Sequence, residues 1–505
     1  MTALLRRGRV GLPAVAAGVL LALSLPPWGW WPLGLAGAAL FYWRLAGLRA
    51  RTRLWAGWLT GLGCYAIGLF WSRAFNWYGA VVLVLVEALF MAAAAALTPP
   101  DRGRAPAFVG ACTLAEALRM SWPFGGLPLG GVFLGQAGGP LVQLARLGGP
   151  LLVTAGVWAG GVVVATLVGR AAALWRGTPG PHSLGAAIAG AVLVALILAG
   201  AAVPDGGAPV GTVHVALVQG GGKRGVSKEQ VPPSTVFDAQ VAATSRVAEA
   251  HPSPDLVLWP EDVVALDRPL AGSPQAAWLS RAARRLHTKL VVGVTEPASS
   301  TTFRNKVVAW GPDGRVVGVF EKVHRVPFGE YVPSRSFFAH FADLSGVPTD
   351  AIPGHGTGLM RTPAGPLGLM VSFEVFYPSR SRASVRAGAE LLAVPTNTSS
   401  YSTSQVPAQE VAADVVQAVQ TGRDLVQAAP TGFSTVVTQR GVVVDRSLLG
   451  RRQVLSATVA LRRGMTPYDH WGDVPVLILS ALALVAGWAR QLRLLVVARV
   501  DCGYS

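Results

Sequence analysis

The sequence predicts a membrane helical bundle that carries one layered α/β domain, inserted between the seventh and eighth helices of an eight-helix bundle. Three observations support this fold class. The 505-residue chain is 51% hydrophobic and 14% charged, whereas a soluble chain usually carries about 25% charge. Long apolar stretches fill its first two hundred residues. Residues 206–465 instead have the composition of a soluble domain, with strand and helix patterns in alternation.

Eight apolar stretches are candidates for membrane spans, because a helix needs about 20 apolar residues to cross the hydrocarbon core. They lie near residues 10–27, 31–48, 54–72, 78–98, 106–122, 149–169, 183–203 and 474–489. The second and the last are short. These stretches divide the chain into a seven-span bundle at 1–205, a soluble domain at 206–465, and a last helix with a short tail at 466–505.

The arginines predict the orientation of the bundle. Fourteen arginines lie at segments that share one side if the N-terminus is cytoplasmic. The short loops of the other side hold Arg73 and Arg146, with Arg119 near the end of a span. Cytoplasmic loops carry the excess of basic residues in membrane proteins. We therefore expect cytoplasmic N- and C-termini and an extracytoplasmic soluble domain in a bacterial cell membrane.

The net charge of +17 does not indicate nucleic acid, because most of the excess is arginine beside apolar spans, where it sets topology. Cysteines are found at 64, 112 and 502, so the soluble domain has no thiol nucleophile and no disulfide framework. The histidines are scattered without ligand spacing, and the sequence predicts no metal and no organic cofactor.

Two groups of charged residues inside the predicted spans stand out. Glu116 and Arg119 are three residues apart, close enough to pair on one helix face. Glu87 lies deep in the fourth stretch, in VLVLVEALF. An ionisable group in lipid is costly and often functional, so a functional role and a paired or protonated structural role both stay open for Glu87.

The soluble stretch has the pattern of an α/β domain. Apolar strands are expected in VHVALVQ, DLVLWPE, KLVVGVTE, PLGLMV and ELLAVPTN, and helices in STVFDAQVAATSRVAEA, SPQAAWLSRAARRLH and SRSRASVRAGA. The segment KVVAWGPDGRVVGVFEKVH predicts a hairpin that turns at Pro312-Asp313-Gly314.

Three polar residues terminate or follow predicted strands: Glu261, Lys322 and Ser372. Each alone has a structural explanation, as a helix-end charge, a solvated edge residue or a turn residue. Together they provide a base, a cation and a nucleophile, which acyl transfer requires. The carboxylate accepts the proton of the nucleophile, and the ammonium stabilises the oxyanion.

The motifs around these residues are similar to those of a known family. WPE at 259–261, KVHRVPFGEYVP at 322–333 and SFE at 372–374, with the order of spans around the domain, resemble the apolipoprotein N-acyltransferase family. Its members carry a nitrilase-like (carbon–nitrogen hydrolase) domain. The resemblance implies a four-layer αββα sandwich on an eight-helix bundle. It also implies that Glu261 is the general base and Lys322 the oxyanion-stabilising residue, with Glu330 and Glu374 in support.

The resemblance further implies a reaction in two halves. The nucleophile takes an acyl chain from a phospholipid and releases a lysophospholipid. The acyl group then passes to the α-amino group of the diacylglyceryl-cysteine of a diacylated apolipoprotein, which is the last step of lipoprotein maturation.

The chain departs from this family at the nucleophile itself. Ser372 occupies the position of the family cysteine, and Phe373 that of its usual tyrosine. Four interpretations stay open: a working serine in a retuned site, a catalytically silent relative that binds lipid or lipoprotein, an engineered serine that traps a complex, and hydrolysis of a small amide. A transporter function would require paired polar groups at the midplane, for which Glu87 alone is thin support.

Overall fold

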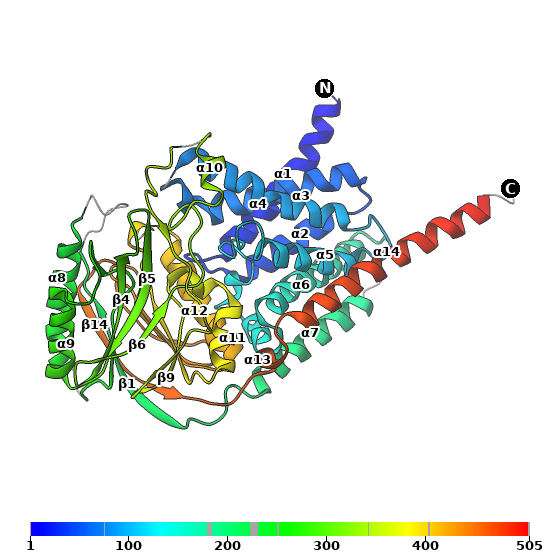
Figure 1. Cartoon of the computed structure of the whole chain (residues 1–505). Helices are drawn as coiled ribbons and strands as arrows, with labels where there is room; N and C mark the ends of the chain where they lie inside the picture. The colour runs from blue at the N-terminus through cyan, green and yellow to red at the C-terminus, as the bar shows by residue number, and fades with distance from the viewer. Residues whose placement is uncertain are drawn as a thin grey trace. The chain divides into compact units, whose positions relative to one another are not determined.

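The computed structural model describes residues 2–74, 76–178, 184–222, 231–249, 252–341, 343–401 and 404–502. The chain folds into two compact units, one formed by Met1–Val203 with Trp471–Ser505 and the other by Pro204–His470. Figure 1 shows a helical unit and a unit that contains the strands.

A helix covers most of each of the eight apolar stretches. The helices of this unit are α1 (Thr2–Ser24), α2 (Trp31–Arg44), α3 (Ala50–Gly68), α4 (Trp77–Leu97), α5 (Arg104–Arg119), α6 (Ala145–Trp175), α7 (Leu184–Ala202) and α14 (Val474–Cys502). Short 3₁₀ turns lie at Phe70–Ala74, Leu134–Gln136 and Pro140–Leu144. The last helix is longer than the expected 474–489, because its hydrogen bonding continues past the apolar stretch into the arginine-rich tail.

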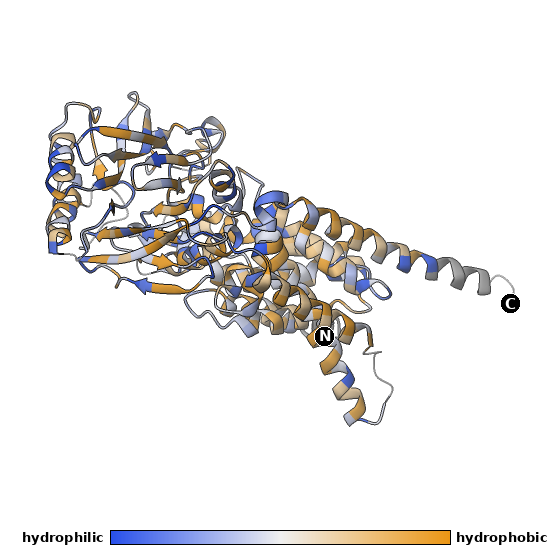
Figure 2. Ribbon diagram, turned by 90° about the horizontal axis from the view of Figure 1, so that it is seen from below, coloured by the Kyte–Doolittle hydropathy of each residue, from blue (hydrophilic) through white to orange (hydrophobic). Residues whose placement is uncertain are grey.

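Four helical stretches within the described residues are long and apolar enough to cross a membrane. They are Trp77–Leu97, Pro140–Trp175, Leu184–Ala202 and Val474–Arg493, and Gly11–Ser24 is apolar but shorter. Figure 2 shows the strongly apolar colouring of this helical unit. The number of crossings and the side on which each loop lies stay predictions.

Glycines bring neighbouring helices of this unit close together. Gly57 and Gly61 lie one turn apart on α3, where a side chain would meet α4: a Cβ would lie 2.4 Å from the Met91 carbonyl oxygen at the first position and 2.6 Å from the Ala88 Cα at the second. Small residues four apart allow this approach between helices in lipid, where dispersion contacts provide much of the association energy.

A buried ionic cluster ties α4 to α5. Arg119, which is fully buried, donates to both oxygens of Glu116 (2.9 and 2.7 Å) and to Glu87 Oε2 (3.1 Å). It also donates to the carbonyl oxygens of residues 127–129. The predicted Glu116–Arg119 pair is confirmed, and Glu87 proves to be a partner of the same guanidinium.

We expect Arg119→Leu to destabilise the helical unit by about 3–5 kcal/mol, because it leaves two buried carboxylates without a cation. Thermal unfolding of the detergent-solubilised protein measures this loss. Adding Glu87→Gln and Glu116→Gln should restore much of the stability, since no unpaired charge then remains. An Arg119→Leu protein that melts like the wild type would contradict the assignment.

The second unit contains two sheets. Within the described residues, the larger has the order β14-β1-β2-β4-β5-β6, with β3 beside β4 and β7 beside β5, and the smaller has the order β13-β12-β11-β10-β9-β8. The strands are β1 (Gly211–Gln219), β2 (Leu256–Leu258), β3 (Val264–Ala265), β4 (Lys289–Pro297), β5 (Thr302–Trp310), β6 (Val316–Glu321), β7 (Asp350–Ala351), β8 (Leu359–Thr362), β9 (Gly365–Leu369), β10 (Leu391–Pro395), β11 (Leu425–Ala428), β12 (Thr435–Val437), β13 (Val443–Arg446) and β14 (Gln453–Leu461).

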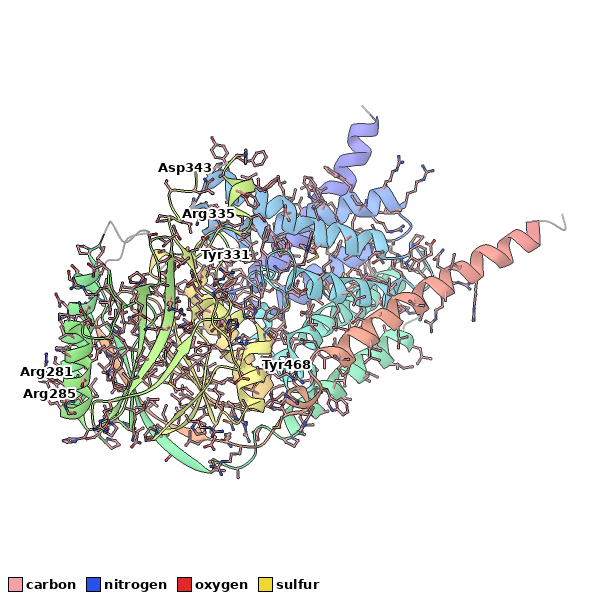
Figure 3. The ribbon with its side chains drawn as sticks, in the orientation of Figure 1. Arg281, Arg285, Tyr331, Arg335, Asp343 and Tyr468 are labelled. Atoms are coloured by element: carbon pink, nitrogen blue, oxygen red, sulfur yellow. The ribbon has the colours of Figure 1, made fainter. Side chains whose placement is uncertain are left out.

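Helices cover the outer faces of the two sheets. Figure 1 shows α8 (Pro233–Thr244) and α9 (Pro274–Leu286) beside the larger sheet, and α11 (Pro378–Arg386) and α12 (Val406–Thr421) beside the smaller. Short helices lie at α10 (Arg335–Phe338) and α13 (Pro467–Trp471), and 3₁₀ turns at Ser245–Glu249, Ser372–Phe376 and Ser399–Tyr401. Arg281 and Arg285, labelled in Figure 3, lie on the exposed face of α9.

Strand alternation explains the four layers. Val213, Val215 and Leu217 of β1 belong to the core shared by both sheets, whereas Ala216 and Val218 belong to the core beneath α8 and α9. Successive side chains of a strand point to opposite faces, so a strand covered on both faces is apolar throughout. The nitrilase-like αββα sandwich expected from the sequence is therefore the observed fold.

Parallel pairing determines where the strand ends meet. β1, β2 and β4 are parallel neighbours, as are β9, β10 and β11. The carboxyl ends of parallel strands lie at one edge of a sheet, which is where open α/β folds place their ligands.

Candidate active site

The predicted site residues follow three different strands. Glu261 lies three residues after the end of β2, Lys322 directly after β6, and Ser372 three residues after β9. Glu261 and Lys322 are 5% and 2% exposed, whereas Ser372 is half-buried. A charged side chain is rarely buried to this degree unless it is paired.

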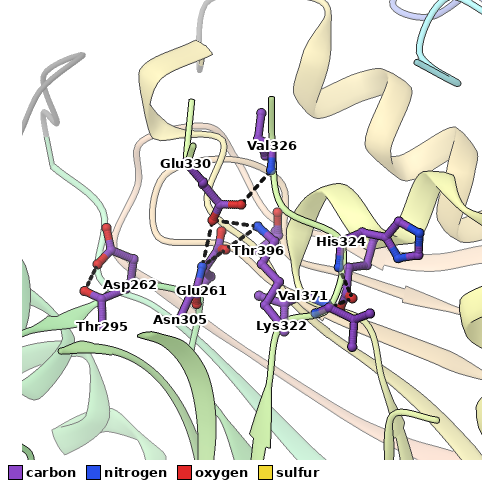
Figure 4. A network of polar contacts seen from close by, with 12 residues as sticks. Glu261, Asp262, Thr295, Asn305, Lys322, His324, Val326, Glu330, Val371 and Thr396 are labelled. Carbon is purple, nitrogen blue, oxygen red and sulfur yellow. Dashed lines mark hydrogen bonds and ion pairs between the residues drawn. The ribbon is translucent and has the colours of Figure 1, made fainter. Parts of the chain in front are cut away.

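The structure brings Glu261, Lys322 and Glu330 into one cluster. Lys322 Nζ donates to Glu261 Oε1 (2.9 Å) and to Glu330 Oε1 (3.0 Å). Figure 4 shows both carboxylates next to the ammonium, with dashed lines for these bonds. An ammonium has three N–H donors, so these contacts leave one for a further acceptor.

Asn305 is a member of the cluster that the sequence did not predict. Its Nδ2 donates to Glu261 Oε1 (2.7 Å) and to Glu330 Oε1 (2.9 Å) from the middle of β5. Asparagine is depleted in strands, so an asparagine inside a predicted strand is the signal by which the sequence could have indicated Asn305. Within the described residues, no hydrogen bond engages Glu261 Oε2, and this oxygen is the one available to accept a proton.

Burial and charge oppose each other at this cluster. Burial raises the pKa of Glu261 above its ordinary value, while Lys322 acts to lower it. Burial alone would lower the pKa of Lys322, but the charges of Glu261 and Glu330 outweigh it, and that pKa lies above its ordinary value. Lys322 is therefore a permanent cation beside a carboxylate of increased basicity.

The segment that carries Glu330 is held at several points. Glu330 Oε2 accepts the Val326 N–H (2.8 Å), which closes the turn between Lys322 and Glu330. The Arg325 guanidinium lies 3.9 Å from the centroid of the Tyr331 ring. Farther along, Arg335 pairs with Asp350. Figure 3 labels Tyr331 and Arg335 in this segment.

Glu374 connects the serine turn to the lysine segment. Its Oε1 accepts the N–H groups of Val323 and His324 (both 3.0 Å), and its Oε2 accepts the N–H of Val371 (2.8 Å). Val323 follows Lys322 and Val371 precedes Ser372, so one fully buried carboxylate fixes both backbones. Burial raises the pKa of Glu374, an effect that the nearby Arg380 opposes.

The backbone of Ser372 is left-handed, with φ +50°. This conformation costs a residue other than glycine roughly 1–2 kcal/mol, and such strain is characteristic of nucleophiles at sharp strand-to-helix turns. Phe373, which follows it, is buried and packs its ring 5.2 Å from that of Tyr377. A local sequence pattern does not reveal this strain, because serine carries no mark of a positive φ.

A backbone contact links the ends of the two sheets. The Glu261 N–H donates to the carbonyl oxygen of Thr396 (3.3 Å), and Thr396 directly follows β10, the parallel neighbour of β9. Glu261 from the larger sheet thus contacts the edge of the smaller sheet from which the Ser372 turn also begins. Figure 4 shows Thr396 beside Glu261 and Lys322.

His324 is a further polar group that the sequence did not single out. Its ring stacks on that of Tyr377 with centroids 4.4 Å apart. Burial, with the charges of Arg380 and Lys322, lowers the pKa of His324 to about 4. The imidazole is therefore neutral at physiological pH.

Two family profiles match this chain. A profile described as apolipoprotein N-acyltransferase N-terminal domain covers residues 17–163, and one described as carbon-nitrogen hydrolase covers residues 215–464.

Full-length relatives match almost the whole chain. The apolipoprotein N-acyltransferase of Mycolicibacterium smegmatis is 31% identical, with 94% of this chain and 83% of the relative covered. That of Geobacter metallireducens is 30% identical, with 95% and 94% covered. Among solved structures, a carbon-nitrogen hydrolase from Helicobacter pylori G27 is 18% identical with a TM-score of 0.40, covering 52% of this chain and 95% of that one.

Proposed function

This chain belongs to the apolipoprotein N-acyltransferase family, and we propose that it performs the acyl transfer of that family with Ser372 as nucleophile, Glu261 as general base and Lys322 as the oxyanion-stabilising cation. The protein is a membrane-associated acyltransferase that N-acylates lipoproteins. The proposal for the site is supported chiefly by one observation: Lys322 Nζ is within 3.0 Å of both Glu261 and Glu330.

The first half-reaction forms an acyl-enzyme. The Ser372 hydroxyl attacks the ester carbonyl of a phospholipid while Glu261 accepts its proton. The remaining N–H donor of Lys322 stabilises the oxyanion. The ester C–O bond then breaks, and the leaving glycerol oxygen takes the proton from Glu261. The products are a lysophospholipid and an oxygen ester at Ser372.

The second half-reaction releases the acyl group as an amide. The α-amino group of the diacylglyceryl-cysteine attacks the Ser372 ester, and Glu261 accepts a proton from that nitrogen. The C–O bond to Ser372 breaks, and the proton returns to the serine oxygen. The product is an N-acylated lipoprotein, and the enzyme returns to its starting state.

The roles proposed for Glu330 and Glu374 follow from their contacts. Glu330 shares Lys322 and Asn305 with Glu261, so it orients the ammonium and adds a negative charge that keeps the lysine protonated. Glu374 fixes the backbone on both sides of the site. Phe373 supplies an apolar wall beside the nucleophile.

We propose that the strand-containing unit faces the outer leaflet and that both termini are cytoplasmic. The arginine distribution favours this orientation. Lipoprotein N-termini and the phospholipid donor are accessible together at a membrane surface, so a site at that surface suits both substrates.

The direct test supplies the purified full-length protein with a phospholipid labelled in one acyl chain and a synthetic diacylglyceryl-cysteine peptide. We expect labelled lysophospholipid without the peptide, and N-acylated peptide when it is added, both measured by mass spectrometry. Absence of both products for the wild type and for Ser372→Cys would refute the proposed function.

A further inference from the structure

Glu410 is a buried acid on α12 that is linked to the Glu261–Lys322–Glu330 cluster through one residue, Thr396. Every residue of α12 except Ala408 is buried, including Glu410 and Asp414, which are 1% and 0% exposed. These two acids are one helical turn apart and lie on the same face of the helix. Two neighbouring negative charges without cations would be strongly unfavourable there.

The contacts of Glu410 favour its neutral form. One oxygen, Oε1, hydrogen bonds to the hydroxyl of Thr396. Within the described residues, the other oxygen, Oε2, has no hydrogen-bond partner, and no cation lies within ion-pair distance of the carboxyl. A buried carboxylate with so few partners is much more costly than a buried carboxylic acid.

Thr396 connects Glu410 to the candidate active site. Its hydroxyl bonds to Glu410, and its carbonyl oxygen accepts the backbone N–H of Glu261 at 3.3 Å. Its own N–H donates to the Ala428 carbonyl oxygen at 2.9 Å. Glu410 therefore fixes the residue to which the backbone of Glu261 is bound.

The electrostatics agree with this geometry. Burial raises the pKa of Glu410 to about 8, with a smaller increase due to Glu261, while the hydrogen bond of Thr396 and the charge of Lys322 oppose the shift. Burial and Glu410 together raise the pKa of Asp414 well above its ordinary value. The charged or titratable groups that act on Glu410 are thus Glu261, Lys322 and Asp414.

We propose that Glu410 is a positioning residue of the acyl-transfer site, and that in its neutral form it holds Thr396 and, through Thr396, the backbone of Glu261. This inference rests on the proposed function. With Glu410 neutral, the cluster of Glu261, Glu330 and Lys322 carries one net negative charge. An ionised Glu410 adds a second, which opposes the developing oxyanion and weakens catalysis.

The test compares three variants of the full-length enzyme between pH 6 and pH 9.5. Glu410→Gln keeps a neutral group of the same shape, and at pH 7 its kcat should stay within about threefold of wild type. Above pH 8 the wild type should lose activity as Glu410 ionises, whereas Glu410→Gln should not. Glu410→Leu removes the bond to Thr396, and we expect kcat to fall tenfold or more with KM unchanged.

Asp414→Asn is the matched control. Asp414 is equally buried on the same face of α12, but it bonds to Thr435 rather than to Thr396. Its neutral variant should keep the pH profile of the wild type. If Glu410→Leu fails to fold, Thr396→Val removes the same hydrogen bond from the other side and should lower kcat similarly.

Thermal unfolding provides a readout that requires no activity. The folded-state pKa of Glu410 is above its ordinary value, so the neutral acid contributes stability at low pH that is lost as the pH rises through about 8. The melting temperature of the wild type should therefore fall more between pH 6 and pH 9 than that of Glu410→Gln.

The outcomes separate this inference from the proposed function. No acyl-enzyme in either the wild type or Ser372→Cys refutes the proposed function. An active enzyme in which Glu410→Leu is unimpaired, in which Glu410→Gln is as impaired as Glu410→Leu, or in which Glu410→Gln keeps the alkaline decline overturns the role of Glu410.

Discussion

Replacing Ser372 by cysteine is expected to raise the rate of acyl transfer at least tenfold, and replacing it by alanine to abolish the acyl-enzyme. A free thiol has a pKa of about 8.5, whereas an alkyl hydroxyl ionises several units higher and depends more heavily on its base. A thioester also reacts faster with an amine than an oxygen ester does. Both half-reactions should therefore accelerate, and the strained backbone accepts cysteine as well as serine.

The measurement is kcat with labelled phospholipid, together with the intact mass of the protein before the acceptor peptide is added. Ser379, which is exposed on α11, provides a matched control: Ser379→Cys adds a thiol outside the cluster and should not change the rate. If Ser372→Ala still formed the acyl adduct, another residue would have to be the nucleophile.

Lys322→Met is expected to reduce kcat by roughly 10³-fold or more. Loss of one oxyanion donor typically costs about 10²–10³-fold. Here the same change also leaves the buried Glu261 and the partly buried Glu330 as two carboxylates that share only the Asn305 side chain. The charge of Glu330 then raises the pKa of Glu261 without the opposing charge of Lys322, and removal of one partner from a buried ion pair destabilises a fold by about 3–5 kcal/mol.

A double variant separates these two effects. Adding Glu330→Gln to Lys322→Met removes one unpaired charge, so the melting temperature should recover substantially while kcat stays low. Lys322→Arg keeps the charge but replaces a compact ammonium with a planar fork, and it should retain the fold with a large loss of rate. Activity within tenfold of wild type for Lys322→Met would exclude Lys322 from the oxyanion site.

The candidate site could be predicted from the sequence because polar residues of suitable chemistry follow the ends of predicted strands. Glu261, Lys322 and Ser372 all follow apolar strands, and the long motif KVHRVPFGEYVP is specific. The charged cluster, and through the family resemblance the αββα layers, could therefore be predicted before any coordinates. The partition into two sheets was not predicted from the pattern of alternation, because strand patterns do not tell which strands pair.

Side-chain contacts that depend on tertiary packing could not be predicted from the sequence. Asn305 approaches Glu261 only because β5 lies beside β4 in the larger sheet. The Glu87–Arg119 pair joins residues of two helices whose contact is created by close packing, and no spacing along one helix reveals it. Glu410 was not singled out from the sequence, because the burial of α12 on nearly all sides is a property of the tertiary packing.

The way in which the Ser372 turn is held has a practical consequence. The carboxylate of Glu374 accepts the N–H of Val371, and the Glu374 N–H donates to the Val371 carbonyl oxygen (3.1 Å), so two bonds between residues 371 and 374 span residue 372. Neither hydrogen bond involves the side chain of residue 372, so different reactive side chains can be introduced at this position without loss of either bond. Installing 2,3-diaminopropionate there would convert the transient ester into a durable amide and retain the donor's fatty chain for direct identification.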